Sequence, residues 1–358
     1  MRVDRVRLAG FRPYVRAEAS FAEGVTAIVG PNGAGKTSLI EAVHMALTGY
    51  SPRTTTDTRC VREGSSFLRV EVDGFTRGGP HTSAVGFTPG EAKRITLDGR
   101  ALRSRDTLEE WWACLVFLPD RLAVVKRAPA VRRAYLDRAV SRLEPTHLAD
   151  VRAYTRALAQ RNALLRRIRA GIAVPALLDP WDEQLASHGA AVMAARTRTI
   201  VALAPVFADR LELLGGQAGA SLRYTPRVEG DAGDLLAALA ARRSRDIERA
   251  ASGTGPHLDE VALEERRREL RSFGSQGEQR TAVLALLLAE AALLAERRGE
   301  RPILLLDDVV SELDADRRRR LVAAVRLHGQ AIITATEVAH LPDPPERVLT
   351  VADGTVGG

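Results

Sequence analysis

The sequence predicts an α/β fold whose two halves are separated in the chain by a mainly helical inserted lobe. Three observations predict it. A glycine-rich turn at 30–37 stands between a short apolar run and a helical pattern, and a second apolar run at 303–306 ends in two acidic residues. The segment between them is rich in alanine, leucine and arginine at helical spacing. The two halves of the α/β part therefore come from opposite ends of the chain.

The glycine-rich turn fits the P-loop pattern G-x-x-x-x-G-K-[ST] and reads Gly30-Pro31-Asn32-Gly33-Ala34-Gly35-Lys36-Thr37. A predicted strand at 25–29 precedes it and a predicted helix follows it, which is the context that a P-loop requires. Backbone N–H groups and the helix N-terminus then bind phosphate. We expect Lys36 to reach the β- and γ-phosphates and the Thr37 hydroxyl to bind Mg²⁺. The turn therefore predicts a nucleoside triphosphate site.

The composition limits the class of protein. The chain has 358 residues, of which 45% are hydrophobic, and its formal net charge is +7 with a pI near 10.0. A basic pI favours a polyanionic partner. Two cysteines, Cys60 and Cys114, are too few for a disulfide framework and suit a reducing, cytoplasmic compartment. No apolar run approaches the roughly 20 residues that span a bilayer, so we expect no membrane partner.

The N-terminal segment predicts strands on both sides of short turns. Arg12 lies in the first of these turns, and spacing alone leaves open whether it contacts nucleotide or solvent. Asp98-Gly99 is a hairpin signal of type I′. The strands are expected at 2–8, 15–21, 25–29, 67–72, 84–87 and 94–97. A helical pattern begins at 106, and the apolar run at 115–118 marks the crossing into the inserted lobe.

The remaining elements are mostly helices, followed by a return to strands. The helices are expected at 132–143, 147–170, 181–214 (interrupted by Pro205), 235–251, 278–298 and 313–327. Strands are expected at 221–225, 302–306, 330–334 and 347–351. The predicted domains are an N-terminal part of the α/β head at 1–116, the inserted lobe at 117–257 and a C-terminal part of the head at 258–358.

The apolar run Ile303-Leu304-Leu305-Leu306 followed by Asp307-Asp308 is a Walker B pattern. We expect Asp307 to hold Mg²⁺ together with Thr37, and Asp308 to position the attacking water. A strand that ends at an ordinary acidic turn is the alternative.

The pentad Ser275-Gln276-Gly277-Glu278-Gln279 precedes the apolar helix that leads to the Walker B strand. A serine and a glycine at a helix start can form a second anion site. The P-loop already supplies the phosphate site for the nucleotide that this chain binds. We therefore expect Ser275, Gln276 and Gly277 to cap the γ-phosphate of a nucleotide held by another copy of the chain. The alternative is a capping box made by Ser275 and Glu278. The turn Ser311-Glu312-Leu313-Asp314 follows Walker B and is either an interface turn or another cap.

Together these motifs resemble the ABC-type P-loop ATPase head that is shared with SMC proteins. Several further stretches resemble the RecF family of bacterial recombination mediators over nearly the whole chain. They are Leu8-Ala9-Gly10-Phe11-Arg12-Pro13-Tyr14, Phe117-Leu118-Pro119-Asp120-Arg121-Leu122, Arg132-Arg133-Ala134-Tyr135-Leu136-Asp137 and Gly255-Pro256-His257-Leu258-Asp259-Glu260, together with Ser275-Gln276-Gly277-Glu278-Gln279-Arg280.

The resemblance implies an ATP-dependent homodimer that binds duplex DNA or a single-strand/double-strand junction and helps to load recombinase with the RecO and RecR proteins. It also implies a nucleotide contact for Arg12 and a catalytic set of Lys36, Asp307, Asp308 and Ser275. The implied ligands are ATP and Mg²⁺.

The chain departs from the ABC pattern at three points. It has no glutamine at the crossing between lobes, no histidine after the strand at 330–334, and aspartate rather than glutamate at 308. We therefore expect slow hydrolysis, with ATP acting as a dimer switch. The nucleotide-binding subunit of an ABC transporter is the alternative function, and these departures argue against it. A small-molecule kinase would leave the pentad at 275–279 unexplained.

Arginine-rich helical stretches offer candidate DNA contacts at 161–169, 242–249, 266–271 and 317–320. Each is also what a solvated helix face looks like in an arginine-biased chain. Aromatic residues make up only 4% of the sequence, which disfavours base stacking on single strands. Backbone contact with duplex DNA and a steep dependence on salt are expected instead.

Overall fold

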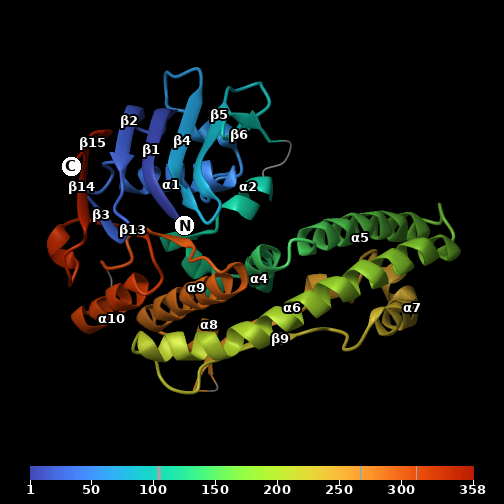
Figure 1. Cartoon of the computed structure of the whole chain (residues 1–358). Coiled ribbons are helices and arrows are strands. Elements are labelled where there is room, and N and C mark those ends of the chain that lie inside the picture. Colours follow the sequence, from blue (N-terminus) through green and yellow to red (C-terminus); the bar gives the residue numbers. More distant parts are fainter. Residues whose placement is uncertain (103–105, 267, 312) are drawn as a thin grey trace. The chain divides into compact units, whose positions relative to one another are not determined.

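The computed structural model describes residues 1–102, 106–266, 268–311 and 313–358 (Figure 1). The chain divides into two compact units. Unit 1 comprises Met1–Arg121, Arg210–Gly216 and Arg280–Gly358, and unit 2 comprises Leu122–Asp209 and Gln217–Gln279. The second boundary lies later in the chain than the sequence suggested, because residues 258–279 contain strands that pair with a strand of the insertion.

The first sheet of unit 1 has the strand order β15-β14-β3-β13-β12-β8. The strands are β3 (Val25–Val29), β8 (Cys114–Phe117), β12 (Ile303–Leu306), β13 (Ala331–Ala335), β14 (Arg347–Ala352) and β15 (Thr355–Gly357). All neighbouring pairs are parallel except β14 with β15. Every residue of β3, β8, β12 and β13 is buried, as expected for strands covered on both faces.

The second sheet of unit 1 is antiparallel, with the order β2-β1-β4-β5-β6-β7. Its strands are β1 (Arg2–Phe11), β2 (Tyr14–Ser20), β4 (Leu68–Thr76), β5 (Gly79–Phe87), β6 (Arg94–Leu97) and β7 (Arg100–Ala101). Asp98 and Gly99 both have positive φ, at 49° and 77°, as a type I′ turn requires. The predicted strands are confirmed, and the sheet also contains β7.

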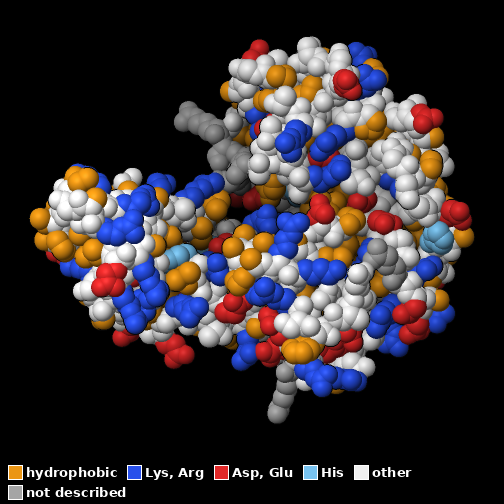
Figure 2. Space-filling model, turned by 180° about the vertical axis from the view of Figure 1, so that it is seen from behind, with side chains coloured by type: hydrophobic (Ala, Val, Ile, Leu, Met, Phe, Trp, Pro, Cys, Tyr) orange, Lys and Arg blue, Asp and Glu red, His pale blue; other side chains and the backbone are white. Residues whose placement is uncertain are grey.

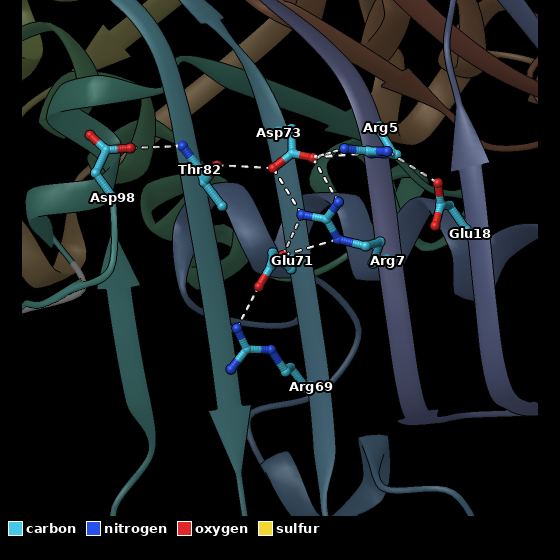
Figure 3. A network of polar contacts seen from close by, with 8 residues as sticks. All are labelled: Arg5, Arg7, Glu18, Arg69, Glu71, Asp73, Thr82 and Asp98. Carbon is cyan, nitrogen blue, oxygen red and sulfur yellow. Dashed lines mark hydrogen bonds and ion pairs between the residues drawn. The ribbon is translucent and has the colours of Figure 1, made fainter.

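Charged side chains cover the outer face of the antiparallel sheet (Figure 3). Asp73 accepts from Arg5 at 2.9 Å and from Arg7 at 3.0 Å, and Glu71 contacts both Arg7 and Arg69. Cross-strand pairs of opposite charge stabilise a sheet modestly. The alternation of buried apolar and exposed charged residues explains why this sheet has one core face and one solvated face.

Helix α1 (Lys36–Thr48) contacts strands of both sheets. All residues from Ser38 to Thr48 are buried, which fits a helix enclosed on every side. The main hydrophobic core combines residues of α1 with those of both sheets. The other helices of unit 1 are η1 (Asp57–Cys60), α2 (Asp106–Trp111), most of α9 (Gln276–Arg298), α10 (Ala315–Arg326) and η5 (Val338–His340).

Unit 2 is mainly helical, as predicted, but it also contains a three-stranded sheet. Its helices are α3 (Ala123–Lys126), α4 (Pro129–Leu143), α5 (His147–Arg169), most of α6 (Asp179–Leu213), α7 (Ala232–Arg249), α8 (Leu270–Phe273) and the short η3 (Pro175–Leu178) and η4 (Pro256–Leu258). The short η2 (Pro119–Leu122) belongs to unit 1 except for its last residue. Its sheet pairs β9 (Ser221–Thr225) with β10 (Glu260–Glu265), and β10 with β11 (Arg268–Glu269). Strands β10 and β11 and helix α8 were not predicted from the sequence.

Helix α6 continues through Pro205, so the predicted interruption at this residue is wrong. Proline removes one N–H donor from the helix. Leu203 and Phe207, on either side of Pro205, are buried, and their packing holds the helical turns before and after the proline.

One helical segment, Pro175–Leu213, is long and apolar enough to cross a membrane by length and composition. That corrects the expectation that no segment reaches this limit. The core helices of soluble proteins meet the same criteria of length and composition. Within α6, Asp182 and Arg196 are buried in ion pairs with Arg161 and Asp137, which suits a core helix of unit 2.

Candidate nucleotide site

The P-loop runs from the end of β3 to the start of α1. Gly30, Gly33 and Gly35 have φ values of 154°, 83° and 119°, which favour glycine. A Cβ on Gly30 would lie 2.1 Å from the Val351 carbonyl oxygen, and one on Gly35 would lie 2.8 Å from the Tyr14 hydroxyl. The loop is therefore pressed against the protein on one side. On the other side Pro31, Asn32 and Gly33 are exposed.

The start of α1 suits an anion. Its N-cap is Gly35, and among the described residues no side chain caps it and no acidic residue lies in its first turn. The first N–H groups of a helix without a side-chain cap need another partner. A phosphate group supplies such a partner and also meets the positive end of the helix dipole.

Lys36 lies over the loop. Its Nζ donates to the carbonyl oxygens of Gly30 at 2.6 Å and Pro31 at 2.9 Å. Partial burial lowers the pKa of Lys36, and the carboxylates of Asp307 and Asp308 oppose that shift. The ammonium group is thus held at the mouth of the loop, where it can bind phosphate oxygens.

A hydrogen-bonded chain links the P-loop to the Walker B strand. The Thr37 hydroxyl lies 2.9 Å and 2.8 Å from the two carboxylate oxygens of Asp307, and the Thr334 hydroxyl donates to Asp307 at 2.7 Å. Thr334 is fully buried and Asp307 is 3% exposed. The structure therefore brings together Thr37 and Asp307, the two residues predicted to hold Mg²⁺.

Thr334 is a site residue that the sequence analysis missed. Strand β13 lies between β3 and β12, and in this register Ile333 pairs with Leu306. The next residue, Thr334, therefore meets Asp307 at the carboxyl edge of the sheet. Its hydroxyl also accepts from the backbone N–H of Asp308 at 2.9 Å.

Asp308 has a strained backbone with a φ of 51°. A non-glycine residue in this region costs on the order of 1 kcal/mol or more and needs support from its surroundings. Thr334 supplies support at the N–H, while Arg280 and Ser311 donate to the carbonyl oxygen. Strain of this kind is common at functional sites. Glu312 of the following turn lies outside the described residues, and Asp314 is the N-cap of α10.

Arg12 lies beside α1 and not in open solvent. Its guanidinium forms a bidentate pair with Glu41 of α1, at 3.0 Å and 2.8 Å. Glu41 is fully buried and also accepts from Arg53 at 3.0 Å and from Ser51 at 2.6 Å. These contacts hold the pKa of Glu41 below its usual value despite its burial. Glu41, Ser51 and Arg53 were not predicted, because a glutamate on a helix usually indicates a solvated position.

The pentad at 275–279 lies in unit 2, at the start of α9. The Ser275 hydroxyl accepts from the Glu278 N–H at 3.3 Å, and the Glu278 carboxylate accepts from the Ser275 N–H at 2.7 Å. This is the capping box that the sequence analysis gave as the alternative reading. Ser275 and Gln276 are exposed and Gly277 is partly exposed, so the cap leaves this helix end open to another molecule.

The arrangement fits a nucleotide with a magnesium ion. The glycine loop, the uncapped start of α1 and Lys36 suit phosphates. The oxygens of Thr37 and Asp307 are ligands of the kind that Mg²⁺ takes together with phosphate oxygens and water. No group of three or more His, Cys, Asp or Glu side chains that would hold a metal alone occurs within the described ranges. A metal at this site would therefore depend on the nucleotide for part of its coordination.

We predict that Asp307→Asn stabilises the protein without nucleotide. Burial and the neighbouring Asp308 raise the pKa of Asp307 above its value in the unfolded chain. The free energy of unfolding therefore falls as the pH rises from the pKa of the unfolded chain, about 3.9, through the higher pKa of the folded protein. At neutral pH Asp307 is ionised in both states, and the folded protein is destabilised by the full free energy of burying this charge. Asparagine keeps the shape and removes this cost.

The measurement is thermal unfolding from pH 4 to pH 8. At pH 7 the Asp307→Asn variant should unfold about 2–4 °C higher, the shift that about 1 kcal/mol produces, and the difference should shrink as the pH falls. Asp209→Asn, at an exposed position of α6, is the matched control and should show neither effect. A loss of stability in Asp307→Asn at pH 7 would contradict the prediction.

Comparison with known proteins points to one family. A model described as an AAA domain matches residues 5–101. A DNA replication and repair protein RecF from Heliobacterium modesticaldum is 35% identical over 353 residues, covering 97% of this chain and 95% of the relative. The RecF protein of Streptomyces avermitilis is 37% identical and covers 99% of each chain.

Solved structures give the same fold. A structure of the recombination mediator protein RecF with ATP in the RecFOR pathway has a TM-score of 0.89 and 26% identity, and covers 99% of this chain and 96% of that one. An Smc head bound to the C-winged helix domain of ScpA has a TM-score of 0.61 and 16% identity, covering 99% and 96% of the chains, and supports the fold alone. The predicted ATPase-head fold is therefore confirmed.

Proposed function

Because the chain belongs to the RecF family of DNA replication and repair proteins, we propose that it is an ATP-dependent DNA-binding protein of recombinational repair and replication-fork maintenance. In this proposal it dimerises on ATP at gapped duplex DNA and helps to load recombinase. Its partners are the RecO and RecR proteins and its compartment is the cytoplasm. The name of the RecFOR pathway in the description of the solved relative supports the choice of partners.

One observation carries the proposal: the hydrogen-bonded chain of Thr37, Asp307 and Thr334. It links a loop that suits phosphates to a carboxylate that suits a metal. Thr37 and Asp307 would hold a Mg²⁺ ion that binds with ATP, and Thr334 would keep the Asp307 carboxylate in place. The metal would supply positive charge beside the phosphates.

Asp308 is the proposed water-positioning residue. Its backbone is fixed by Thr334 and Arg280, so its side chain projects from a rigid turn. Aspartate is one methylene shorter than the glutamate of transporter subunits and reaches less far toward a γ-phosphate. We therefore propose turnover well below about 10 per second, the median of enzymes, so that hydrolysis acts as a release step for the dimer.

In the proposed dimer, ATP lies between Gly30–Thr37 of one copy and Ser275–Gly277 of the other. The exposed start of α9 offers N–H groups and a helix dipole to the γ-phosphate. The γ-phosphate would then join the two copies, and its loss would release them. No observation favours a transporter subunit.

We predict that Ser275→Arg abolishes the ATP-driven doubling of mass in solution while ATP binding persists. Arginine at this position adds bulk and a charge at the proposed interface, far in sequence from the P-loop. The measurement is light scattering with and without ATP and a short duplex, alongside ATP titration.

Ser244→Arg is the matched control, because Ser244 is an exposed serine on another helix of unit 2. The control should dimerise like the original chain. If the original chain remains monomeric with ATP and DNA, Ser275 acts only as a helix cap and the dimer proposal fails. If Ser275→Arg doubles in mass normally, the dimer stands but does not form through this helix end.

A further inference from the structure

On the face shown in Figure 2, lysine and arginine side chains are interspersed with acidic ones, so the arrangement of the basic residues is more informative than their number. On the outer face of the antiparallel sheet, three arginines from distant parts of the sequence fall in one row. Arg16 pairs in register with Ala9, Ala9 with Arg69, Arg69 with Gly86, and Gly86 with Arg94. We propose that this row, Arg16, Arg69 and Arg94, binds the phosphate backbone of duplex DNA.

The spacing of the row suits a repeating polyanion. Neighbouring strands of a sheet lie about 4.8 Å apart, so Arg16, Arg69 and Arg94, on alternate strands, are about 10 Å apart. The whole row spans about 19 Å, which corresponds to five or six base pairs at about 3.4 Å each. The small residues Ala9 and Gly86 lie between the arginines and leave the row accessible.

The charges of the row are available. All three arginines are exposed, and no hydrogen bond or ion pair involves the Arg16 or Arg94 side chain within the described parts of the chain. Arg69 contacts Glu71 through one amino group, yet its side chain remains 58% exposed. Glu18, Glu71 and Asp73 of this face lie in the next two rows, where Arg5 and Arg7 pair with them.

A hollow of about 210 Å³ lies between Arg69 and Arg94, lined also by Ala84, Gly86, Thr96 and Gly99. A Cβ added to Gly86 would meet no atom within 4 Å, and this glycine has no positive φ. Neither backbone conformation nor packing therefore requires glycine here. A side chain at position 86 would fill the hollow without disturbing the sheet, which makes this position a sensitive test.

The choice of a duplex rests on the proposed function and on the chemistry of the row. Guanidinium groups suit phosphate oxygens. Stacking of bases on a single strand needs a series of aromatic side chains, and the one exposed aromatic residue beside the row within the described structure is Phe67. The backbone of a duplex uses the three charges and needs no further aromatic groups.

The experiment measures binding of a 30-base-pair duplex to the full chain with ATP, between 50 and 200 mM salt. The triple variant Arg16→Gln, Arg69→Gln, Arg94→Gln should reduce the slope of log K against log salt by about 3, roughly one per lost phosphate contact. At 0.1 M salt its affinity should fall by about 100-fold or more. Gly86→Leu keeps every charge and should weaken binding by about tenfold.

Arg77→Gln is the matched control, because Arg77 is exposed in the turn at the other end of the same sheet. ATP titration and thermal unfolding should be unchanged in every variant. If the original chain binds no duplex, both the proposed function and this inference fail. If it binds duplex and the triple variant and Gly86→Leu bind equally well, the inference alone fails. Loss of single-strand binding with unchanged duplex binding would also overturn it.

Discussion

Replacing Lys36 with alanine is expected to lower the affinity for ATP by at least about 100-fold and to abolish ATP-driven dimerisation. The Nζ of Lys36 lies within 2.9 Å of two loop carbonyl oxygens, so the charge is already fixed at the mouth of the loop. Hydrogen bonds to charged groups contribute about 1.5–3 kcal/mol each, and two lost phosphate contacts exceed the 2.8 kcal/mol that corresponds to 100-fold.

Calorimetric titration with ATP and Mg²⁺ measures this effect, and light scattering measures the dimer. Lys126→Ala is the control, because Lys126 is an exposed lysine in α3. It should bind ATP like the original chain. Retention of ATP-driven doubling in Lys36→Ala would show that the nucleotide does not bind at the P-loop.

The second large effect is expected in unit 2, where Arg161→Leu should destabilise the fold by about 3–5 kcal/mol. Arg161 is fully buried and donates to Asp182 at 2.5 Å, Asp246 at 2.8 Å and Ser252 at 2.8 Å. Both aspartates are also fully buried. Removing the guanidinium leaves Asp246 without its buried counter-charge, while Asp182 keeps its ion pair with Arg243.

Urea unfolding followed by circular dichroism measures this loss. Arg166→Leu is the control on the same helix, because Arg166 is exposed, and it should change stability by less than about 0.5 kcal/mol. The double variant Arg161→Leu, Asp246→Leu should recover part of the loss, since it removes both charges. Equal stability of Arg161→Leu and the original chain would mean that the buried pair is not formed.

The motifs of the nucleotide site could be predicted from the sequence because each is a short continuous run. The P-loop and Asp307 need only their own neighbours to be recognised. Thr334 could not be predicted, because its position depends on β13 lying between β3 and β12. The order of strands in a sheet cannot be inferred from the sequence of a single segment. The pairing of Arg12 with Glu41 likewise depends on how a turn folds onto a helix.

The arginines show the same limit. The helical stretches predicted as DNA contacts contain Arg161, which is buried, and Arg243, which is paired with two aspartates. The arginines at 317–320 form ion pairs and a hydrogen bond with nearby residues of α10 and of the turn before it. The row on the sheet could not be predicted from the sequence. Positions 16, 69 and 94 are aligned only by the register of four strand pairings.

The assembly of unit 1 from both chain ends has a consequence for its synthesis on the ribosome. The antiparallel sheet is complete by Ala101 and β8 follows at Cys114, yet β12 and β13, which also contact α1 on its other side, begin only at Ile303. At about 5–20 residues per second, roughly 10–40 s pass between the two events. During that interval this side of α1 is covered only in part, so the nascent chain is expected to need a chaperone.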